Sequence, residues 1–404
     1  MIYNKLLNIA KESIYPISLY ARQIAGTVVL FLIARYLTIY DFGLFSSYKN
    51  IAAYCFVLAN LNYNDYILVS TKAEPTKVRQ KTALFLIHAI LLGVSYCLIS
   101  NCCPLENHFL FMLVVARTFF DGVFFSLILP YFQATKKFTT IGWINVFYAV
   151  GISIIAIISF IFKLSLVKFL ILNIILGLTN FIQCSYYIKI DYLGVILKIK
   201  KYVQLLDKKI WGYIGSSITV NLYTPLPALF VSTMLPKEQA ALFFAGYTIA
   251  TIPSLLINAQ NQKVTPLLIK ANVDEIKRIM KKNLIFIVSI TGLMLLLMAI
   301  FGKLVLVLFY GQKYYENAYL ILLMLMLGNI LYGIAANYSI HITASGNQAV
   351  KIPMQIELII CSISTLFLFS KFGIYGAATS VLITMIYMVI RYKNFSDNWL
   401  KQKG

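Results

Sequence analysis

The sequence predicts an all-α integral membrane protein with about twelve transmembrane helices, in two six-helix lobes related as parallel repeats around a central cavity. Its composition, the spacing of its apolar runs and the similarity of its two halves predict this class. The 404 residues are 60% hydrophobic and 12% charged, whereas soluble domains carry about 25% charged residues. Because about 20 apolar residues span a bilayer, each long apolar run is a candidate span.

The apolar runs follow one another along the whole chain and leave almost no sequence for a soluble domain. The expected spans are 13–33, 42–63, 82–100, 109–130, 141–161, 165–187, 211–234, 240–262, 284–301, 317–342, 350–369 and 374–391.

The net charge of +21 reflects topology rather than nucleic-acid binding. If both termini are cytoplasmic, most of the 35 Lys and Arg residues fall in segments on the inner side. This bias follows the positive-inside rule and favours an even number of spans. We therefore expect a multi-pass protein that contacts anionic membrane lipids and does not bind nucleic acid.

The chain divides near its middle. The segment 192–209 mixes Leu, Ile and Val with lysines, as expected of an amphipathic segment on the membrane surface. We expect an N-terminal lobe at 1–190, a basic linker at 191–210 and a C-terminal lobe at 211–404. Two pairs of similar strings, each about 200 residues apart, support a parallel repeat. They are 34–54 with 232–252 and 131–151 with 340–360.

Three cations lie inside expected spans and predict an anion-binding cavity. Arg22, Lys49 and Arg117 each stand about eight or nine residues from a span end, which is well inside the hydrocarbon core at about 1.5 Å per residue. A cation there costs about 2.5–3.5 kcal/mol and normally faces a bundle interior or water. The alternative for each is a hydrogen bond to helix carbonyls or an ion pair inside one lobe. Asp121 lies four residues after Arg117, on the same helix face.

Carboxylates and tyrosines supply further candidates. Asp121, Glu357 and Asp65 could couple transport to a proton or sodium ion, although Asp65 could be solvated and Glu357 could bond inside its lobe. Tyr223 and Tyr247 could stack on sugars. No phosphate-binding loop, metal-binding histidine motif or paired-cysteine site occurs. We therefore expect no catalytic residue, no metal and no cofactor, so the chain is not expected to be an enzyme.

Several strings resemble those of a known family. ARYLTIYDFGLFS resembles the "A-R-x-L-G-x-x-x-F/Y-G" signature of polysaccharide flippases, with Thr38 where glycine is usual. GYTIA resembles their "G-x-Y-x-x-A" element, and QATKKF and TASGNQ resemble their short inner turns. These flippases belong to the multidrug/oligosaccharidyl-lipid/polysaccharide exporter superfamily, and the resemblance covers the whole chain through topology and length.

The resemblance implies a substrate and a location. Such flippases move undecaprenyl-diphosphate-linked oligosaccharides to the outer leaflet of the bacterial inner (cytoplasmic) membrane, for O-antigen, lipopolysaccharide or related polysaccharide synthesis. Arg22, Lys49 and Arg117 would then bind the diphosphate or glycan, since arginine donates bidentate hydrogen bonds to phosphate. A monomeric, ion-driven antiporter is expected, with a polymerase and chain-length proteins of the same pathway as further candidate partners. The alternatives are an ion-coupled multidrug exporter of the same superfamily and a membrane-embedded polysaccharide polymerase or ligase.

Overall fold

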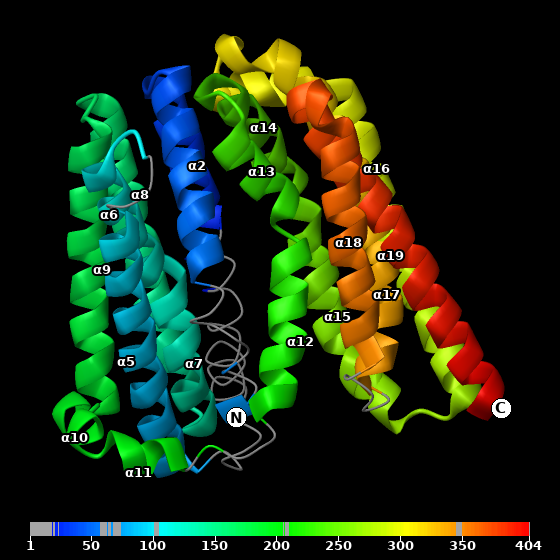
Figure 1. Ribbon diagram of the computed structural model, residues 1–404, viewed down its shortest axis with the longest axis horizontal. Coiled ribbons are helices and arrows are strands. Elements are labelled where there is room, and N and C mark those ends of the chain that lie inside the picture. The colour runs from blue at the N-terminus through cyan, green and yellow to red at the C-terminus, as the bar shows by residue number, and fades with distance from the viewer. Residues whose placement is uncertain are drawn as a thin grey trace, which may run out of the picture. The chain divides into compact units, whose positions relative to one another are not determined.

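The structure is a computed structural model that describes residues 18, 21–22, 24–56, 63, 66–67, 74–100, 105–204, 206, 210–344 and 350–403. Within these residues every regular element is a helix (Figure 1). The chain divides into two compact units. Unit 1 comprises Met1–Thr38 and Tyr48–Ile218, and unit 2 comprises Ile39–Ser47 and Thr219–Gly404. The fold class is therefore all-α, as the composition predicts.

Unit 1 is a bundle of long apolar helices. Its helix α6 packs against α9, α9 packs against α8, and α5 packs against α7 (Figure 1). The elements are an apolar helix at Ile24–Tyr36, α2 (Ile39–Cys55, shared with unit 2), α5 (Pro75–Ser100), α6 (His108–Thr118), the π-helix η1 (Phe119–Val123), α7 (Phe124–Ala134), α8 (Phe138–Ile161), α9 (Leu166–Ile188), α10 (Tyr192–Leu197), α11 (Ile199–Gln204) and most of α12 (Ile210–Tyr223).

Unit 2 is organised around α17, which packs against α14, α15, α16 and α19. Gly246 of α14 allows close contact there, because a Cβ atom at this position would lie 3.1 Å from the backbone nitrogen of Leu322. The elements are α13 (Leu226–Met234), α14 (Lys237–Ala250), α15 (Ile252–Lys270), α16 (Val273–Tyr310), the 3₁₀ turn η2 (Gln312–Tyr314), α17 (Tyr315–Ala344), α18 (Lys351–Phe369), the 3₁₀ turn η4 (Ser370–Phe372) and α19 (Gly373–Lys403).

The first half of α2 packs as part of unit 2. Phe42 makes edge-to-face contacts with Tyr310 and Tyr314, at centroid distances of 5.9 and 5.8 Å. The neighbouring Gly43 faces the backbone of Lys237, where a Cβ atom would overlap the carbonyl group. The Phe-Gly pair of the signature string thus has a packing role.

Every expected span overlaps a helix or a pair of helices. Among the described residues, eight helical stretches are long and apolar enough to cross a membrane, and the last of them, Lys351–Lys401, covers α18 and nearly all of α19. The proposed lobe boundaries stay a prediction. Where the structure describes the segment 191–210, it contains α10 and α11, and Val195 of α10 packs against Ala83, Leu84 and Ile87 of α5.

Candidate functional site

Arg22 lies at the centre of a polar cluster inside unit 1. Its guanidinium donates to the Oδ1 atom of Asn145 at 3.2 Å and to the backbone carbonyl of Asp121 at 2.6 Å. Its Cζ atom also lies 4.2 Å from the ring centroids of Phe125 and Tyr148. Two rings therefore hold the planar guanidinium by cation–π contact, while both hydrogen bonds run to neutral oxygens.

A π-helical turn supplies the carbonyl that Arg22 binds. The segment Phe119–Val123 is a π-helix, and the N–H of Phe124 bonds to the carbonyl of Phe119, five residues earlier. Such a turn inserts an extra residue and disturbs the regular i to i−4 pairing. Asp121 lies in the middle of the turn, and its carbonyl accepts the hydrogen bond from Arg22.

The side chain of Asp121 joins the same cluster. Its Oδ2 atom lies 3.1 Å from the Nε atom of Arg117, and its Oδ1 atom accepts a short hydrogen bond from the hydroxyl of Tyr148. Arg117 is buried and its Cζ atom lies 5.2 Å from the ring centroid of Phe169. The expected i, i+4 ion pair is therefore present.

Lys49 adds a third cation to this cluster. It lies on α2 with an exposed side chain, and it interacts electrostatically with Arg117 and Asp121. The structure thus brings Arg22, Lys49 and Arg117 together around the carboxylate of Asp121. Among the residues that the structure describes, this cluster contains three formal positive charges and one negative charge, which leaves a positive surplus. Because charges interact more strongly in a low-dielectric interior than in water, this surplus favours an anion.

A pocket of about 280 Å³ between α8 and α9 adjoins the cluster. Tyr148 lines it, and so does Asn180, whose Nδ2 atom is buried without a hydrogen-bond partner. A buried donor without a partner carries a desolvation cost that a bound acceptor would offset. The remaining lining residues are Ile144, Phe147, Leu176, Thr179 and Gln183.

The unit 2 candidate Glu357 is already paired. Its Oε1 atom accepts from a guanidinium nitrogen of Arg391 at 2.7 Å, and its Oε2 atom lies 2.5 Å from the Nε atom of the same arginine. Tyr387 also donates to Oε2, at 2.9 Å. This bidentate geometry joins the carboxylate to the guanidinium through two contacts. The intra-lobe alternative expected for Glu357 is thus present in the structure.

The two candidate tyrosines lie against other side chains. Tyr223 is buried in the core of unit 2 and its hydroxyl points to the sulfur of Met388 at 3.7 Å. Tyr247 stacks on Phe243 at a centroid distance of 5.8 Å. Stacking of either ring on a sugar would need these contacts to change. Asp65 lies outside the described residues.

Sequence reasoning missed several members of these clusters. Asn145 and Tyr148 are polar residues three apart in an apolar run, and this spacing on one helix face could have indicated them. It also missed Lys81, which is buried on α5 and donates to the hydroxyl of Tyr66 at 3.3 Å. Among the described residues, no group of three or more His, Cys, Asp and Glu could hold a metal ion.

Solved structures share the fold. The chain resembles the lipid II flippase MurJ in an inward closed conformation, with a TM-score of 0.71 and 14% identity over 94% of this chain and 87% of that one. It also resembles an inward-facing multidrug resistance MATE family transporter of the MOP superfamily, with a TM-score of 0.67 and 14% identity over 94% of this chain and 95% of that one. A point mutant of the Vibrio cholerae MATE transporter VcmN matches with a TM-score of 0.61 and 14% identity over 98% and 99% of the two chains.

A comparison with curated proteins finds no match. The family assignment rests instead on a match between the sequence and a family model. Residues 10–272, more than half of the chain, match the family described as polysaccharide biosynthesis protein. The fold that the chain shares with these flippase and transporter structures agrees with this match. The chain therefore belongs to the polysaccharide biosynthesis protein family and is a multi-pass membrane protein with the fold of these structures.

Proposed function

We propose that the chain is a flippase for undecaprenyl-diphosphate-linked oligosaccharides, acting by alternating access in the bacterial inner membrane to supply O-antigen or a related surface polysaccharide. The observation that carries this proposal is the positive surplus around Arg22, Lys49, Arg117 and Asp121. A diphosphate is a concentrated anion, and the rest of the substrate is a polar glycan and a long apolar tail. The family match and the resemblance to a lipid II flippase support the same substrate class.

Arg22 is the group best prepared to bind the diphosphate. Its hydrogen bonds run to the amide oxygen of Asn145 and to a backbone carbonyl, and a phosphate oxygen is a stronger acceptor than either. Phe125 and Tyr148 keep the guanidinium plane fixed. Binding would therefore replace neutral acceptors with a charged one, without first breaking an ion pair.

Arg117 and Asp121 play a second role in this proposal. Their ion pair neutralises Arg117 while no anion is bound. An arriving diphosphate competes with Asp121 for this guanidinium, so the ion pair opens when the diphosphate binds. Asp121 is therefore the candidate carboxylate of unit 1 for coupling to a proton or sodium gradient.

The test uses purified protein in proteoliposomes. A fluorescent polyprenyl-diphosphate oligosaccharide in the inner-facing leaflet should reach the other leaflet faster with the protein than in empty liposomes. An organic cation dye should not be moved, because the cluster repels cations. Transport of the dye without the glycolipid would overturn the proposal and favour a multidrug exporter.

A further inference from the structure

Three lysines of unit 1 adopt a backbone conformation that side chains usually avoid. Lys136, Lys163 and Lys189 have φ angles of 53°, 47° and 56°. Lys189 directly follows the last residue of α9, and Lys136 and Lys163 lie two residues after the ends of α7 and α8. Glycine is usual at such a position because the left-handed conformation crowds a Cβ atom. Each of these lysines therefore carries a conformational cost that glycine would avoid.

Backbone hydrogen bonds fix the turn that follows α9. The N–H of Lys189 donates to the carbonyl of Tyr186 at 3.2 Å, and the N–H of Ile190 donates to the carbonyl of Ser185 at 3.2 Å. This pair of bonds is the Schellman motif, which satisfies the last carbonyls of a helix. The position of Lys189 is thus set by the helix end.

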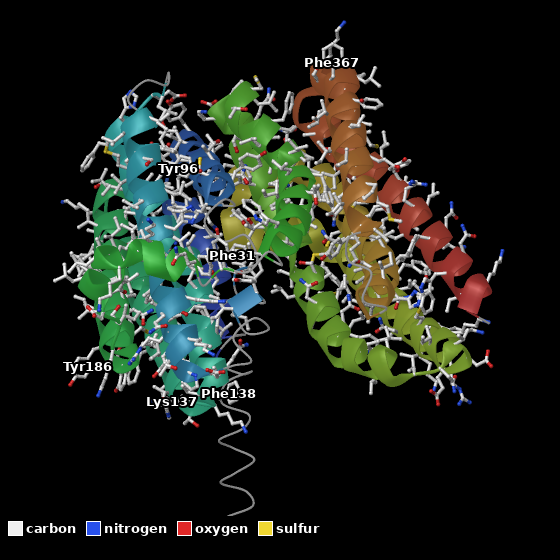
Figure 2. The ribbon with its side chains drawn as sticks, turned by 60° about the horizontal axis from the view of Figure 1, so that its bottom comes forward. Phe31, Tyr96, Lys137, Phe138, Tyr186 and Phe367 are labelled. Carbon is white, nitrogen blue, oxygen red and sulfur yellow. The ribbon has the colours of Figure 1, made fainter. Side chains whose placement is uncertain are left out.

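The turn that follows α7 has the same pattern. The N–H of Lys136 donates to the carbonyl of Gln133 at 3.2 Å, and the N–H of Lys137 donates to the carbonyl of Phe132 at 2.9 Å. Figure 2 shows Lys137 and Tyr186 at the same end of unit 1. The turns that follow α7 and α9 therefore both carry lysines, and they lie at the same end of unit 1.

A pocket of about 720 Å³ lies between these turns. We call it the basic pocket. It contains two ammonium groups and three hydroxyl groups, and all of them can donate hydrogen bonds to a phosphate. Its lining residues are Lys137, Ser185, Tyr186, Tyr187, Lys189 and Ile190.

The nearest carboxylate in sequence has another partner. Asp191 follows the lining residue Ile190, and its Oδ1 atom accepts from the N–H of Gly194 at 2.8 Å. It therefore caps α10. None of the ion pairs that the structure shows among its described residues involves Lys137 or Lys189, so both keep a charge that can attract an anion.

An exposed apolar stripe leads along α9 to the basic pocket. Its members are spaced three or four residues apart, so they share one face of the helix. From first to last, the stripe rises about 22 Å at about 1.5 Å per residue, which exceeds half of the about 30 Å hydrocarbon core. The stripe consists of Ile171, Ile175, Leu178, Ile182 and Tyr186, which are 39%, 54%, 44%, 59% and 80% exposed.

We propose that the basic pocket binds the phosphate of an anionic glycerophospholipid whose acyl chain lies along this stripe. Phosphate is the chemistry that two lysines and neighbouring tyrosine hydroxyls recognise, and basic pockets between transmembrane helices are suited to lipid headgroups. A free phosphate would contact the lysines but would leave the apolar stripe of α9 without a ligand. Tyrosine at the end of the stripe also suits the boundary between headgroups and hydrocarbon. This site is separate from the Arg22 cluster and does not depend on the transported substrate.

The experiment measures lipid binding directly by native mass spectrometry. Purified protein is titrated with phosphatidylglycerol, phosphatidylcholine or inorganic phosphate. The test variant is Lys137→Ala with Lys189→Gly, because glycine keeps the left-handed turn while removing the charge. The matched control is Lys168→Ala with Lys163→Gly, which makes the same two changes at the other end of the α8–α9 hairpin.

We expect one phosphatidylglycerol to bind wild type and the control alike, and the test variant to bind it on the order of tenfold more weakly or worse. Phosphatidylcholine binding should be the same in all three proteins. Equal losses in test and control variants, or equal binding of both lipids by wild type, would overturn the proposal. Displacement of phosphatidylglycerol by millimolar inorganic phosphate would assign the pocket to a free anion and would also overturn it. If the test variant unfolds, Lys189→Asn with Lys137→Gln replaces it, because asparagine tolerates the left-handed turn.

Discussion

Arg22 donates a hydrogen bond of 2.6 Å to the backbone carbonyl of Asp121, which lies 99 positions later in the chain. The carbonyl belongs to the π-helical turn around Asp121, where the regular backbone pairing of the helix is disturbed. It gives the arginine a neutral partner in place of a carboxylate. The guanidinium therefore keeps its charge available for an anion while its hydrogen-bonding groups stay satisfied.

The first prediction concerns the charge and shape of Arg22. Arg22→Ala should remove most transport, and Arg22→Lys should keep part of it, because lysine keeps the charge but loses the planar fork that binds phosphate in bidentate fashion. The measurement is the rate of glycolipid flipping in proteoliposomes with equal amounts of protein. Lys168→Ala, which removes an exposed cation from α9 in the same unit, is the control and should flip at the wild-type rate. Wild-type flipping by Arg22→Ala would exclude Arg22 from the site.

The second prediction concerns the ion pair of Arg117 and Asp121. Asp121→Asn leaves a buried guanidinium without its counter-charge, which costs about 3–5 kcal/mol at a fully buried pair. Since the side chain of Asp121 is 29% exposed, we expect the lower end of that range. Thermal unfolding in detergent measures the change.

The double variant Arg117→Gln with Asp121→Asn is the matched comparison. It removes both charges, so its loss of stability should be clearly smaller than that of Asp121→Asn alone. If the double variant is the less stable of the two, the ion pair is not what stabilises this part of unit 1.

The positions of the charges within the apolar runs were predictable, but most of their partners were not. Arg22, Lys49 and Arg117 are visible in the sequence because each interrupts an apolar run. The i, i+4 spacing also predicts the contact of Arg117 with Asp121. The contacts of Arg22 with Asn145 and Asp121 depend on how distant helices pack and on a π-turn, and neither feature has a periodic signal. The contact of Arg391 with Glu357 was not predicted either. Arg391 lies at the end of the last expected span, but α19 continues past it, and its guanidinium bonds to Glu357 on α18.

The third prediction tests the packing of the signature string. Gly43→Ala should destabilise the protein by about 1–3 kcal/mol, because the added Cβ would overlap the carbonyl of Lys237 and overpacking forces the backbone to shift. Gly26→Ala is the control on the preceding helix in the sequence, where an added Cβ has no neighbour within 4 Å. It should be neutral or stabilising by up to about 1 kcal/mol, because alanine favours a helix over glycine. Thermal unfolding compares the two, and equal melting temperatures would show that the close contact at Gly43 is not required.

The last prediction concerns Glu357 and the driving force. Its carboxylate has Arg391 and Tyr387 as partners, so a proton or a sodium ion could bind only by replacing Arg391. If this exchange accompanies transport, wild-type flipping should respond to an imposed ion gradient, and Glu357→Gln should flip at a rate that the gradient does not change. The neutral amide still accepts hydrogen bonds but cannot exchange one cation for another.

Glu316 offers a matched control for this experiment, because its exposed carboxylate also accepts a hydrogen bond from a tyrosine, Tyr315, at 2.9 Å. Glu316→Gln should respond to the gradient as wild type does, since none of the ion pairs among the described residues involves Glu316. Proteoliposomes with proton and sodium gradients imposed separately identify the coupling ion. A normal gradient response in Glu357→Gln would assign the pair with Arg391 to the stability of unit 2, and Asp121 would then be the carboxylate through which an ion gradient acts.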